Sequence, residues 1–205
     1  MFREEAKWIR EVLDRTPLKG RSAVNLGSST AEFRQRVQPH IHEEVIAPLE
    51  AAGVQMTHVD LKRDPGVDVA ADLTAADFAA RLAQRFDLVI CANMLEHVQD
   101  IDAVIANILR IATPGAYLLL TVPRRYPLHF DPIDNGFRPR PRDLADLFAR
   151  KVACNLVEGR VISIKDSGYY PVKRSGFPLW GLRLRFRYWI GRYYQVTGVL
   201  LKLTD

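Results

Sequence analysis

The stretch Phe-Asp-Leu-Val-Ile-Cys-Ala-Asn-Met-Leu-Glu-His at residues 86–97 decides the fold of this chain. Its apolar core is continuous rather than alternating, which is typical of a strand buried on both faces of a parallel α/β sheet. Asn93 follows the strand, and we expect a helix to begin near Met94. Because ligands bind just beyond the carboxyl ends of such strands, Asn93, Glu96 and His97 are predicted to line a ligand crevice.

The composition predicts a single domain over residues 1–205. The chain has 205 residues, of which 48% are hydrophobic and 26% charged, enough for one sizeable core and too little for two. Its cysteines, Cys91 and Cys154, have neither a disulfide nor a metal-binding spacing, so we expect no metal site and a reducing, cytoplasmic location. The amphipathic N-terminus does not resemble a secretory signal, and no apolar run is long enough to cross a bilayer.

The net charge of +5 is concentrated near the C-terminus. Residues 160–205 hold nine Lys and Arg against two acids, and residues 177–194 interleave aromatic rings with arginines. This basic aromatic segment, which overlaps a predicted insertion at 165–192, suits peripheral contact with a membrane, an anionic substrate or a nucleic acid. A core helix with a solvated basic face explains the pattern at least as well. We rank nucleic acid lowest, because no RNA-binding module accompanies the segment.

Apolar runs that predict strands alternate with stretches of helical periodicity. The expected strands lie at 22–26, 54–59, 67–71, 86–92, 116–122, 155–164 and 193–203. The expected helices follow an amphipathic N-terminal one and lie at 30–52, 75–84, 101–112 and 144–151. Parallel neighbours need crossover connections, so this order predicts a doubly wound, mostly parallel sheet.

Polar residues follow the first three of these strands. The turn Asn25-Leu-Gly-Ser-Ser-Thr30 offers one glycine for close backbone approach, and hydroxyls that either cap the next helix or bind a ligand. It lacks the glycines of a dinucleotide-binding turn, which disfavours a nicotinamide-dependent oxidoreductase. Asp60 and Asp72 end the next two strands. Asp60 either accepts from two ribose hydroxyls or caps a turn, and Asp72 either accepts from an adenine amino group or caps a helix.

Together these segments resemble the class I S-adenosylmethionine-dependent methyltransferases. The resemblance covers roughly residues 20–125 and is carried by Val24-Asn-Leu-Gly-Ser-Ser, Val59-Asp, Ala71-Asp-Leu, residues 86–98, and Ile108-Leu-Arg-Ile-Ala-Thr-Pro-Gly-Ala-Tyr-Leu-Leu-Leu-Thr-Val-Pro. It implies a seven-stranded, Rossmann-like sheet whose last strand is antiparallel, with S-adenosylmethionine as the cofactor. The Leu-Glu-His after the central strand is similar to small-molecule methyltransferases in particular.

The resemblance also implies which residues contact the cofactor. They are Asn25, Gly27 and Ser28 for the methionine portion, Asp60 with Leu61 for the ribose, Asp72 and Leu73 for the adenine, and Asn93 with Met94 for the sulfonium side. The family usually has an acid at position 25 and further glycines at positions 29 and 31. The alternative is therefore a non-catalytic binding or scaffold domain with a degenerate glycine loop.

A polar loop rich in proline follows the 116–122 strand. It runs from Tyr126 to Pro139, and its pattern is similar to loops in methyltransferases of polysaccharide and sugar pathways. The resemblance thus implies a small-molecule or saccharide-linked acceptor. Methyl transfer to a hydroxyl requires a positioned acceptor and a base that removes its proton.

His129 in this loop is the first candidate for that base, with Asp134 and His97 as the other catalytic candidates. His97 and Asp134 also have structural alternatives. His97 caps or packs at a helix start, and Asp134 forms an ion pair with Arg138 that holds the loop.

Overall fold

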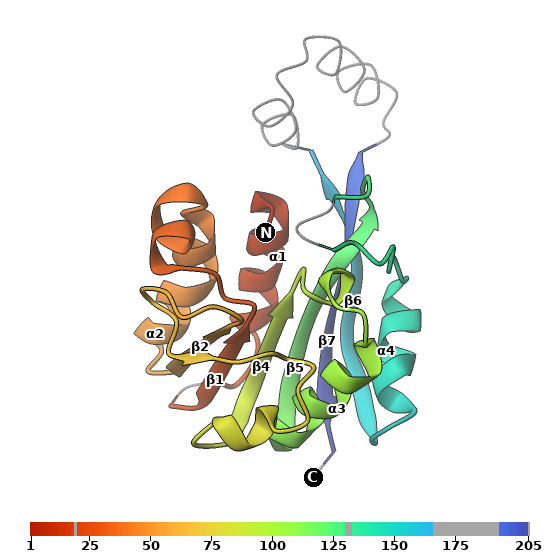
Figure 1. The fold of residues 1–205 in the computed structure, drawn as a ribbon. Helices are drawn as coiled ribbons and strands as arrows, with labels where there is room; N and C mark the ends of the chain where they lie inside the picture. Colours follow the sequence, from red (N-terminus) through yellow and green to blue (C-terminus); the bar gives the residue numbers. More distant parts are fainter. Residues whose placement is uncertain (19, 130–132, 166–192, 205) are drawn as a thin grey trace.

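A computed structural model of the chain describes residues 1–18, 20–129, 133–165 and 193–204 (Figure 1). Residues 166–192 lie outside the described part, and with them nearly all of the predicted insertion and most of the basic aromatic segment. The roles predicted for that segment therefore stay predictions. Within the described ranges, no helix has the length and apolar character needed to span a membrane.

The described residues form a seven-stranded sheet with helices on both faces. The strands are β1 (Ser22–Leu26), β2 (Gln55–Asp60), β3 (Val69–Ala70), β4 (Phe86–Ala92), β5 (Ala112–Arg125), β6 (Cys154–Ile164) and β7 (Tyr194–Leu203). Their order in the sheet is β3-β2-β1-β4-β5-β7-β6, and β7 runs antiparallel to both of its neighbours. The predicted Rossmann-like sheet with an antiparallel last strand is confirmed.

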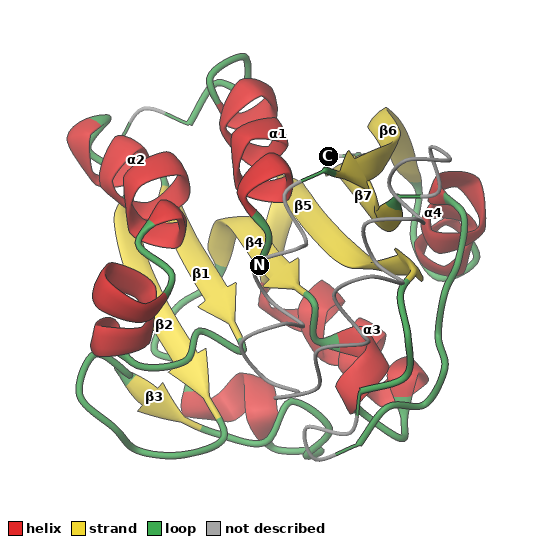
Figure 2. Cartoon of the chain, turned by 90° about the horizontal axis from the view of Figure 1, so that it is seen from above, coloured by secondary structure: helices red, strands yellow, loops and turns green. Residues whose placement is uncertain are grey.

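Two apolar cores cover the two faces of this sheet. The α-helices are α1 (Arg3–Leu13), α2 (Ala47–Ala51), α3 (Ile101–Ile111) and α4 (Pro141–Ala149). Figure 2 shows α1 and α2 on one face and α3 and α4 on the other. In β4, Leu88 and Ile90 pack into the core under α1, whereas Val89 and Cys91 pack into the core under α3. Burial of the central strand on both faces is confirmed.

The prediction that a helix begins near Met94 is wrong. The chain forms only the 3₁₀ turn η4 (Leu95–His97), and α3 begins at Ile101. Asp100 caps α3, because its Oδ1 accepts a hydrogen bond from the N–H of Ala103 at 2.8 Å. The polar residues after β4 therefore lie in a turn between strand and helix.

The prediction of a helix at 75–84 is also wrong, because the helical segment is much shorter. Only the 3₁₀ turn η3 (Phe78–Arg81) forms there. Phe78 is fully buried and Leu82 nearly so, and both belong to the core under α3. A segment this short gains little from helix propensity, so the burial of these two side chains decides its path.

The long helix predicted at 30–52 is interrupted. It consists of two π-helical turns, η1 (Phe33–Val37) and η2 (His42–Ile46), followed by α2. The break falls at Gln38 and Pro39, since proline has no N–H to continue the hydrogen-bond ladder of η1. Gly53, with φ +78°, follows the helix as predicted.

Strand boundaries differ from the prediction at β3 and β5. Only Val69 and Ala70 pair with β2, so the strand predicted at 67–71 is much shorter. β5 begins directly after α3 rather than at residue 116, and a register shift opposite β4 absorbs Gly115, whose φ is +70°. It also continues through Pro123, where a second irregularity interrupts the pairing with β7.

Candidate active site

Two groups of polar residues lie at the carboxyl end of the sheet. The β1–β2 group comes from the ends of those strands and the turn between β1 and η1, and comprises Asn25, Gly27, Ser28, Ser29, Arg34 and Asp60. The loop group comes from η4 and the loop after β5, and comprises Glu96, His97, His129, Asp134 and Arg138.

Gly27 is the residue in the β1–β2 group that no other amino acid could replace without strain. Its φ is +68°, a conformation that favours glycine. A Cβ added there would lie 2.2 Å from both Cγ and Sδ of Met94. The structure thus brings together Gly27 and Met94, two of the residues expected to contact the cofactor.

Asp60 ties the end of β2 to the turn after β1. Its Oδ2 accepts a hydrogen bond from the N–H of Ser29 at 2.7 Å, and its Oδ1 accepts from the N–H of Leu61 at 2.8 Å. The N–H of Ser28 in turn donates to the carbonyl of Val59 at 3.0 Å. Since each carboxylate oxygen has a second lone pair, Asp60 can still accept from the two hydroxyls of a ribose.

Arg34 also binds the turn after β1, a role that the sequence analysis did not predict. Its Nη1 donates to the carbonyls of Ser28 and Ser29 at 3.0 and 2.6 Å, and its Nη2 donates to the carbonyl of Gly66 at 2.8 Å. The side chain is buried, and burial lowers the pKa of Arg34 while nearby carboxylates, Asp60 among them, oppose the shift. Ser29 adopts φ +56°, so the arginine stabilises a left-handed turn at a position where the family usually has glycine.

Asn25 and the hydroxyls of the turn have separate partners. Asn25 is buried, and its Nδ2 lies 3.5 Å from Nδ1 of His58. Burial lowers the pKa of His58 to about 4, so its ring is neutral at pH 7 and can accept that hydrogen bond. Thr30, not Ser28, caps the next helical turn, because its Oγ1 accepts from the N–H of Phe33 at 3.0 Å.

Asp72 and Leu73 lie at the end of β3. Oδ1 of Asp72 accepts from both the N–H and the hydroxyl of Thr74, at 2.8 and 2.7 Å, so this oxygen closes a turn. The helix that Asp72 was predicted to cap does not form near Ala75, so Asp72 closes a turn instead, with its side chain exposed. Leu73 is buried, and Nδ2 of Asn107 donates to its carbonyl at 2.9 Å.

Asn93 is held by residues from two other elements. Its N–H donates to the carbonyl of Thr121 at 2.8 Å, and its Nδ2 donates to Oε1 of Glu5 at 2.8 Å. Asn93 has φ +52°, a left-handed conformation that asparagine tolerates better than most residues. The contact with Glu5 in α1 joins residues 88 positions apart in the chain, and the sequence did not predict it.

His129 and Asp134 form the centre of the loop group. Nδ1 of His129 lies 3.1 Å from Oδ2 of Asp134, and the same oxygen accepts from Arg138 Nη2 at 2.6 Å. The predicted ion pair between Asp134 and Arg138 is therefore present. Burial raises the pKa of Asp134, but hydrogen bonds from Arg138 and from the main chain of His129 and Gly136 together hold it well below its usual range.

The protonation of His129 follows from these contacts. Nδ1 faces the Asp134 carboxylate and, at 3.4 Å, the carbonyl of Pro127, and both groups only accept hydrogen bonds. Nδ1 therefore carries the proton, which leaves Nε2 with a lone pair. Burial, followed by the nearby His97, lowers the pKa of His129, so the ring is neutral at pH 7.

His97 and Glu96 border the same space. Nδ1 of His97 lies 2.6 Å from the carbonyl of Ile133, so it donates that hydrogen bond, and the ring packs edge-on against His129 at 5.0 Å between centroids. Glu96 is fully buried, and neither carboxyl oxygen has a hydrogen-bond partner among the described residues. Burial raises the pKa of Glu96 to about 8, which keeps the group protonated at pH 7.

Asn135 fixes the loop against the turn after β4. Its Nδ2 donates to the carbonyls of Leu95 and Val98 at 2.8 and 2.7 Å, and its N–H donates to the carbonyl of Glu96 at 2.9 Å. The sequence prediction did not single out Asn135. Residues 130–132 of this loop, which include Asp131, lie outside the described part.

The loop group also has a geometry that could hold a cation. One ligand atom from each of Glu96, His97 and His129 lies within 4.8 Å of the other two. Sequence spacing predicts no metal site, because His129 joins the other two residues only through the fold.

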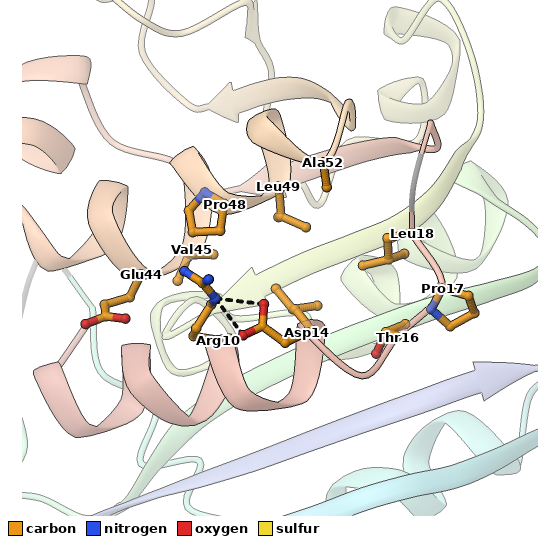
Figure 3. A pocket seen from close by; sticks show the side chains of 11 residues that line it. Arg10, Asp14, Thr16, Pro17, Leu18, Glu44, Val45, Pro48, Leu49 and Ala52 are labelled. Atoms are coloured by element: carbon orange, nitrogen blue, oxygen red, sulfur yellow. Dashed lines mark hydrogen bonds and ion pairs between the residues drawn. The ribbon is translucent and has the colours of Figure 1, made fainter.

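A pocket elsewhere on the molecule is separate from both groups. It has a volume of about 240 Å³ and lies between α1 and the η2–α2 segment, where Leu18 and Ala52 form part of its lining (Figure 3). On its α1 side, Arg10 Nε donates to both oxygens of Asp14 at 2.7 and 2.8 Å. None of its lining residues belongs to the predicted site.

Relatives of known sequence match parts of the chain. The ubiquinone biosynthesis O-methyltransferase of Hahella chejuensis is 44% identical over 57 residues, which are 28% of this chain and 24% of that protein. The enzyme of the same name from Thiobacillus denitrificans is 29% identical over 126 residues, which are 57% of this chain and 50% of that protein. In these matches the chain spans half the length of the relatives or less.

A solved structure shows the same fold over nearly the whole chain. It is the 1,6-didemethyltoxoflavin-N1-methyltransferase of Burkholderia thailandensis, with bound 1,6-didemethyltoxoflavin and S-adenosylhomocysteine. The TM-score is 0.59 at 15% identity, over 98% of this chain and 79% of that one. Residues 3–167 match the family described as methyltransferase domain. This match covers most of the chain, from α1 to the end of β6, and the chain therefore belongs to the methyltransferase domain family.

Proposed function

We propose that the protein transfers a methyl group from S-adenosylmethionine to a hydroxyl of a small molecule. The observation that carries the proposal is the pairing of His129 with Asp134. This pairing leaves a neutral imidazole nitrogen with a lone pair, on the loop that follows β5, near strand ends whose turn suits the cofactor. The relatives named as O-methyltransferases support a hydroxyl acceptor.

The β1–β2 group fits the cofactor by its main-chain shape. Gly27 gives close access to the backbone, and Asp60 retains lone pairs for the ribose hydroxyls. Oδ1 of Asn93 is buried without a hydrogen-bond partner among the described residues, so it suits the cationic sulfonium of the cofactor. Asn25, Ser28, Leu61, Asp72, Leu73 and Met94 complete the proposed contacts.

The residues of the loop group would supply the acid–base chemistry. When bound, the cofactor supplies a methyl group whose bond to sulfur breaks with its electron pair staying on sulfur. The acceptor oxygen forms the new bond to carbon, and its proton passes to Nε2 of His129. Asp134 keeps Nδ1 protonated and stabilises the imidazolium that results. His97 packs against the base and limits its movement.

The acceptor is proposed by class alone. A small-molecule hydroxyl, with a catechol and a monophenol as its probes, agrees with the O-methyltransferase names of the relatives, and a saccharide-linked hydroxyl agrees with the sequence of the 126–139 loop. A peripheral membrane contact through 177–194 and a cytoplasmic location are compatible with both. The rival function is a non-catalytic domain that binds the cofactor or a partner without turnover.

Calorimetric titration with S-adenosylmethionine tests the cofactor proposal. We expect saturable binding, and about tenfold weaker binding by Asp60→Ala, because the ribose loses a charged acceptor. Asp64→Ala is the matched control, since this exposed acid lies in the loop just after Asp60. Folded protein without binding would contradict the proposed function, and undiminished binding by Asp60→Ala would contradict the ribose contact.

A transfer assay tests the acceptor class. The methyl-labelled cofactor is incubated with a catechol, a monophenol and a nucleotide-sugar, and the label in each product is counted. Transfer to the catechol or phenol supports the first class, and transfer to the nucleotide-sugar supports the second. Cofactor binding without transfer to any of these acceptors would favour the non-catalytic alternative.

A further inference from the structure

Glu5 is a buried carboxylate that the N-terminal helix brings to the carboxyl end of the sheet. Its side chain has no solvent exposure. Oε1 accepts from Nδ2 of Asn93 at 2.8 Å and from the hydroxyl of Thr121 at 2.5 Å, while Oε2 accepts from the N–H of Phe2 at 2.9 Å. One oxygen therefore binds the start of α1, and the other binds Asn93, just after β4, and Thr121 within β5.

The contact with Glu5 fixes which way the amide of Asn93 points. A carboxylate oxygen that already receives the Thr121 hydroxyl favours the NH₂ end of the amide over its carbonyl end. The carbonyl oxygen Oδ1 must then point the other way. This Oδ1 is buried and has no hydrogen-bond partner among the described residues.

We propose that Glu5 is a positioning residue, which orients Asn93 so that its carbonyl oxygen faces the sulfonium of the bound cofactor. The inference rests on the proposed function, because it assigns Asn93 to the sulfonium side. Its physical basis is electrostatic. A carbonyl oxygen, backed by a carboxylate on the far side of the same amide, favours a cation over a neutral group in a buried place.

The cofactor and its product differ in the charge of the group that the carbonyl oxygen of Asn93 would face. S-adenosylmethionine carries a positive sulfonium, whereas S-adenosylhomocysteine has an uncharged thioether at the same place. Correct orientation of Asn93 should therefore strengthen binding of the cofactor more than binding of the product. A purely structural role for Glu5 would change both affinities alike.

Glu5→Gln is the informative variant. Glutamine retains an oxygen for the N–H of Phe2, as in ordinary capping boxes, so the start of α1 is kept. The new NH₂ would meet the amide of Asn93 and favour its reversed orientation, with Nδ2 toward the cofactor. We expect binding of S-adenosylmethionine to weaken about tenfold, and binding of S-adenosylhomocysteine to change less than about threefold.

A second substitution provides a rescue. In the double variant Glu5→Gln/Asn93→Asp, the new NH₂ at position 5 donates to a carboxylate at position 93, whose other oxygen faces the cofactor. We expect this exchange of the two groups to restore most of the preference for S-adenosylmethionine. Glu4→Gln is the matched control, since Glu4 lies in the same turn of α1 and accepts instead from the N–H of Lys165 at 2.6 Å.

Calorimetry of both ligands with the wild type and these variants, checked for folding by circular dichroism, decides between the outcomes. An unchanged ratio of the two affinities in folded Glu5→Gln would overturn the inference, as would an equal change in Glu4→Gln. If Glu5→Gln does not fold, the ratio is measured on Asn93→Ala, and an unchanged ratio there overturns the inference too. Failure of the wild type to bind either ligand would instead contradict the proposed function.

Discussion

The β1–β2 group and the loop group lie at the same edge of the sheet but are held together differently. In the β1–β2 group, Asp60 and Arg34 contact main-chain N–H and carbonyl groups of the turn. In the loop group, His129 and Arg138 contact the side chain of Asp134, and Glu96 is buried beside them. The contacts of the β1–β2 group stabilise the backbone conformation of the turn after β1. The contacts of the loop group determine the protonation states of its own side chains.

This difference shows how a turn with few glycines can keep a glycine-like shape. The family usually has further glycines at positions 29 and 31, where this chain has Ser29 and Ala31. The guanidinium of Arg34 and the carboxylate of Asp60 stabilise the left-handed conformation of Ser29 from outside the turn. In the loop group, by contrast, the protonation state of a side chain depends on a particular neighbour, as that of His129 depends on Asp134.

The largest effect is expected from His129→Ala in the loop group. Loss of the base should lower turnover of the best acceptor about a hundredfold to ten-thousandfold. Affinity for S-adenosylmethionine should stay unchanged, because the β1–β2 group is intact. Steady-state kinetics and calorimetry check the two halves of this prediction. Full turnover in the variant would remove His129 from the mechanism.

Arg34→Met should give the next largest effect, in the β1–β2 group. The variant loses three charged hydrogen bonds to main-chain carbonyls, which should lower the free energy of unfolding by about 2–3 kcal/mol and weaken cofactor binding. Arg36→Met is the matched control, since Arg36 lies in the same turn η1 but is exposed. Urea denaturation measures the free energy of unfolding of both variants. Equal effects of the two substitutions would show that the hydrogen bonds of Arg34 do not stabilise the turn.

Glu96→Gln should give the smallest effect, and one that depends on pH. Burial raises the pKa of Glu96 to about 8 in the folded state. Between the ordinary glutamate pKa, which applies to the unfolded chain, and a pH of about 8, the folded protein therefore binds more protons than the unfolded chain. Stability from this group is therefore lost as pH rises through that window. The amide does not titrate, so the variant should gain at least about 1 kcal/mol relative to wild type between pH of about 5 and about 8.

Denaturation of wild type and Glu96→Gln at several pH values measures that difference directly. The lowered pKa values of His58 and His129 reduce stability as pH falls below the ordinary histidine value, and they do so in both proteins. Their contribution therefore cancels. A difference that does not change with pH would mean that Glu96 is ionised in the folded state.

The apolar strands and the ligand edge of the sheet were predictable from local pattern. Continuous apolar runs place β1, β4 and β5, and the polar residues that follow them mark where the strands end. The pairing of Asp134 with Arg138 was predictable as an alternative, since the two residues are four positions apart in the sequence. Helical stretches were predicted less well. The segments at 30–52 and 75–84 have helical composition, but a proline and two buried side chains override it.

The long-range contacts of the site were not predictable. Glu5, Arg34 and Asn135 look like ordinary polar residues in a helix, a turn and a loop. Their partners are distant in sequence, or are main-chain groups that carry no residue signature. The Nδ1 proton of His129 likewise depends on the place of the Asp134 carboxylate, which spacing alone does not give.

The sequence by itself determined the order of strands and helices, the central buried strand and the edge where a ligand would bind. These features follow from periodicity and from the few residues that end strands, which are local properties. Only the tertiary structure decided how the amide of Asn93 is oriented, how the turn at Ser29 is held and which nitrogen of His129 carries the proton. These depend on burial and on partners brought close by the sheet, where removal from water makes each unpaired polar group costly.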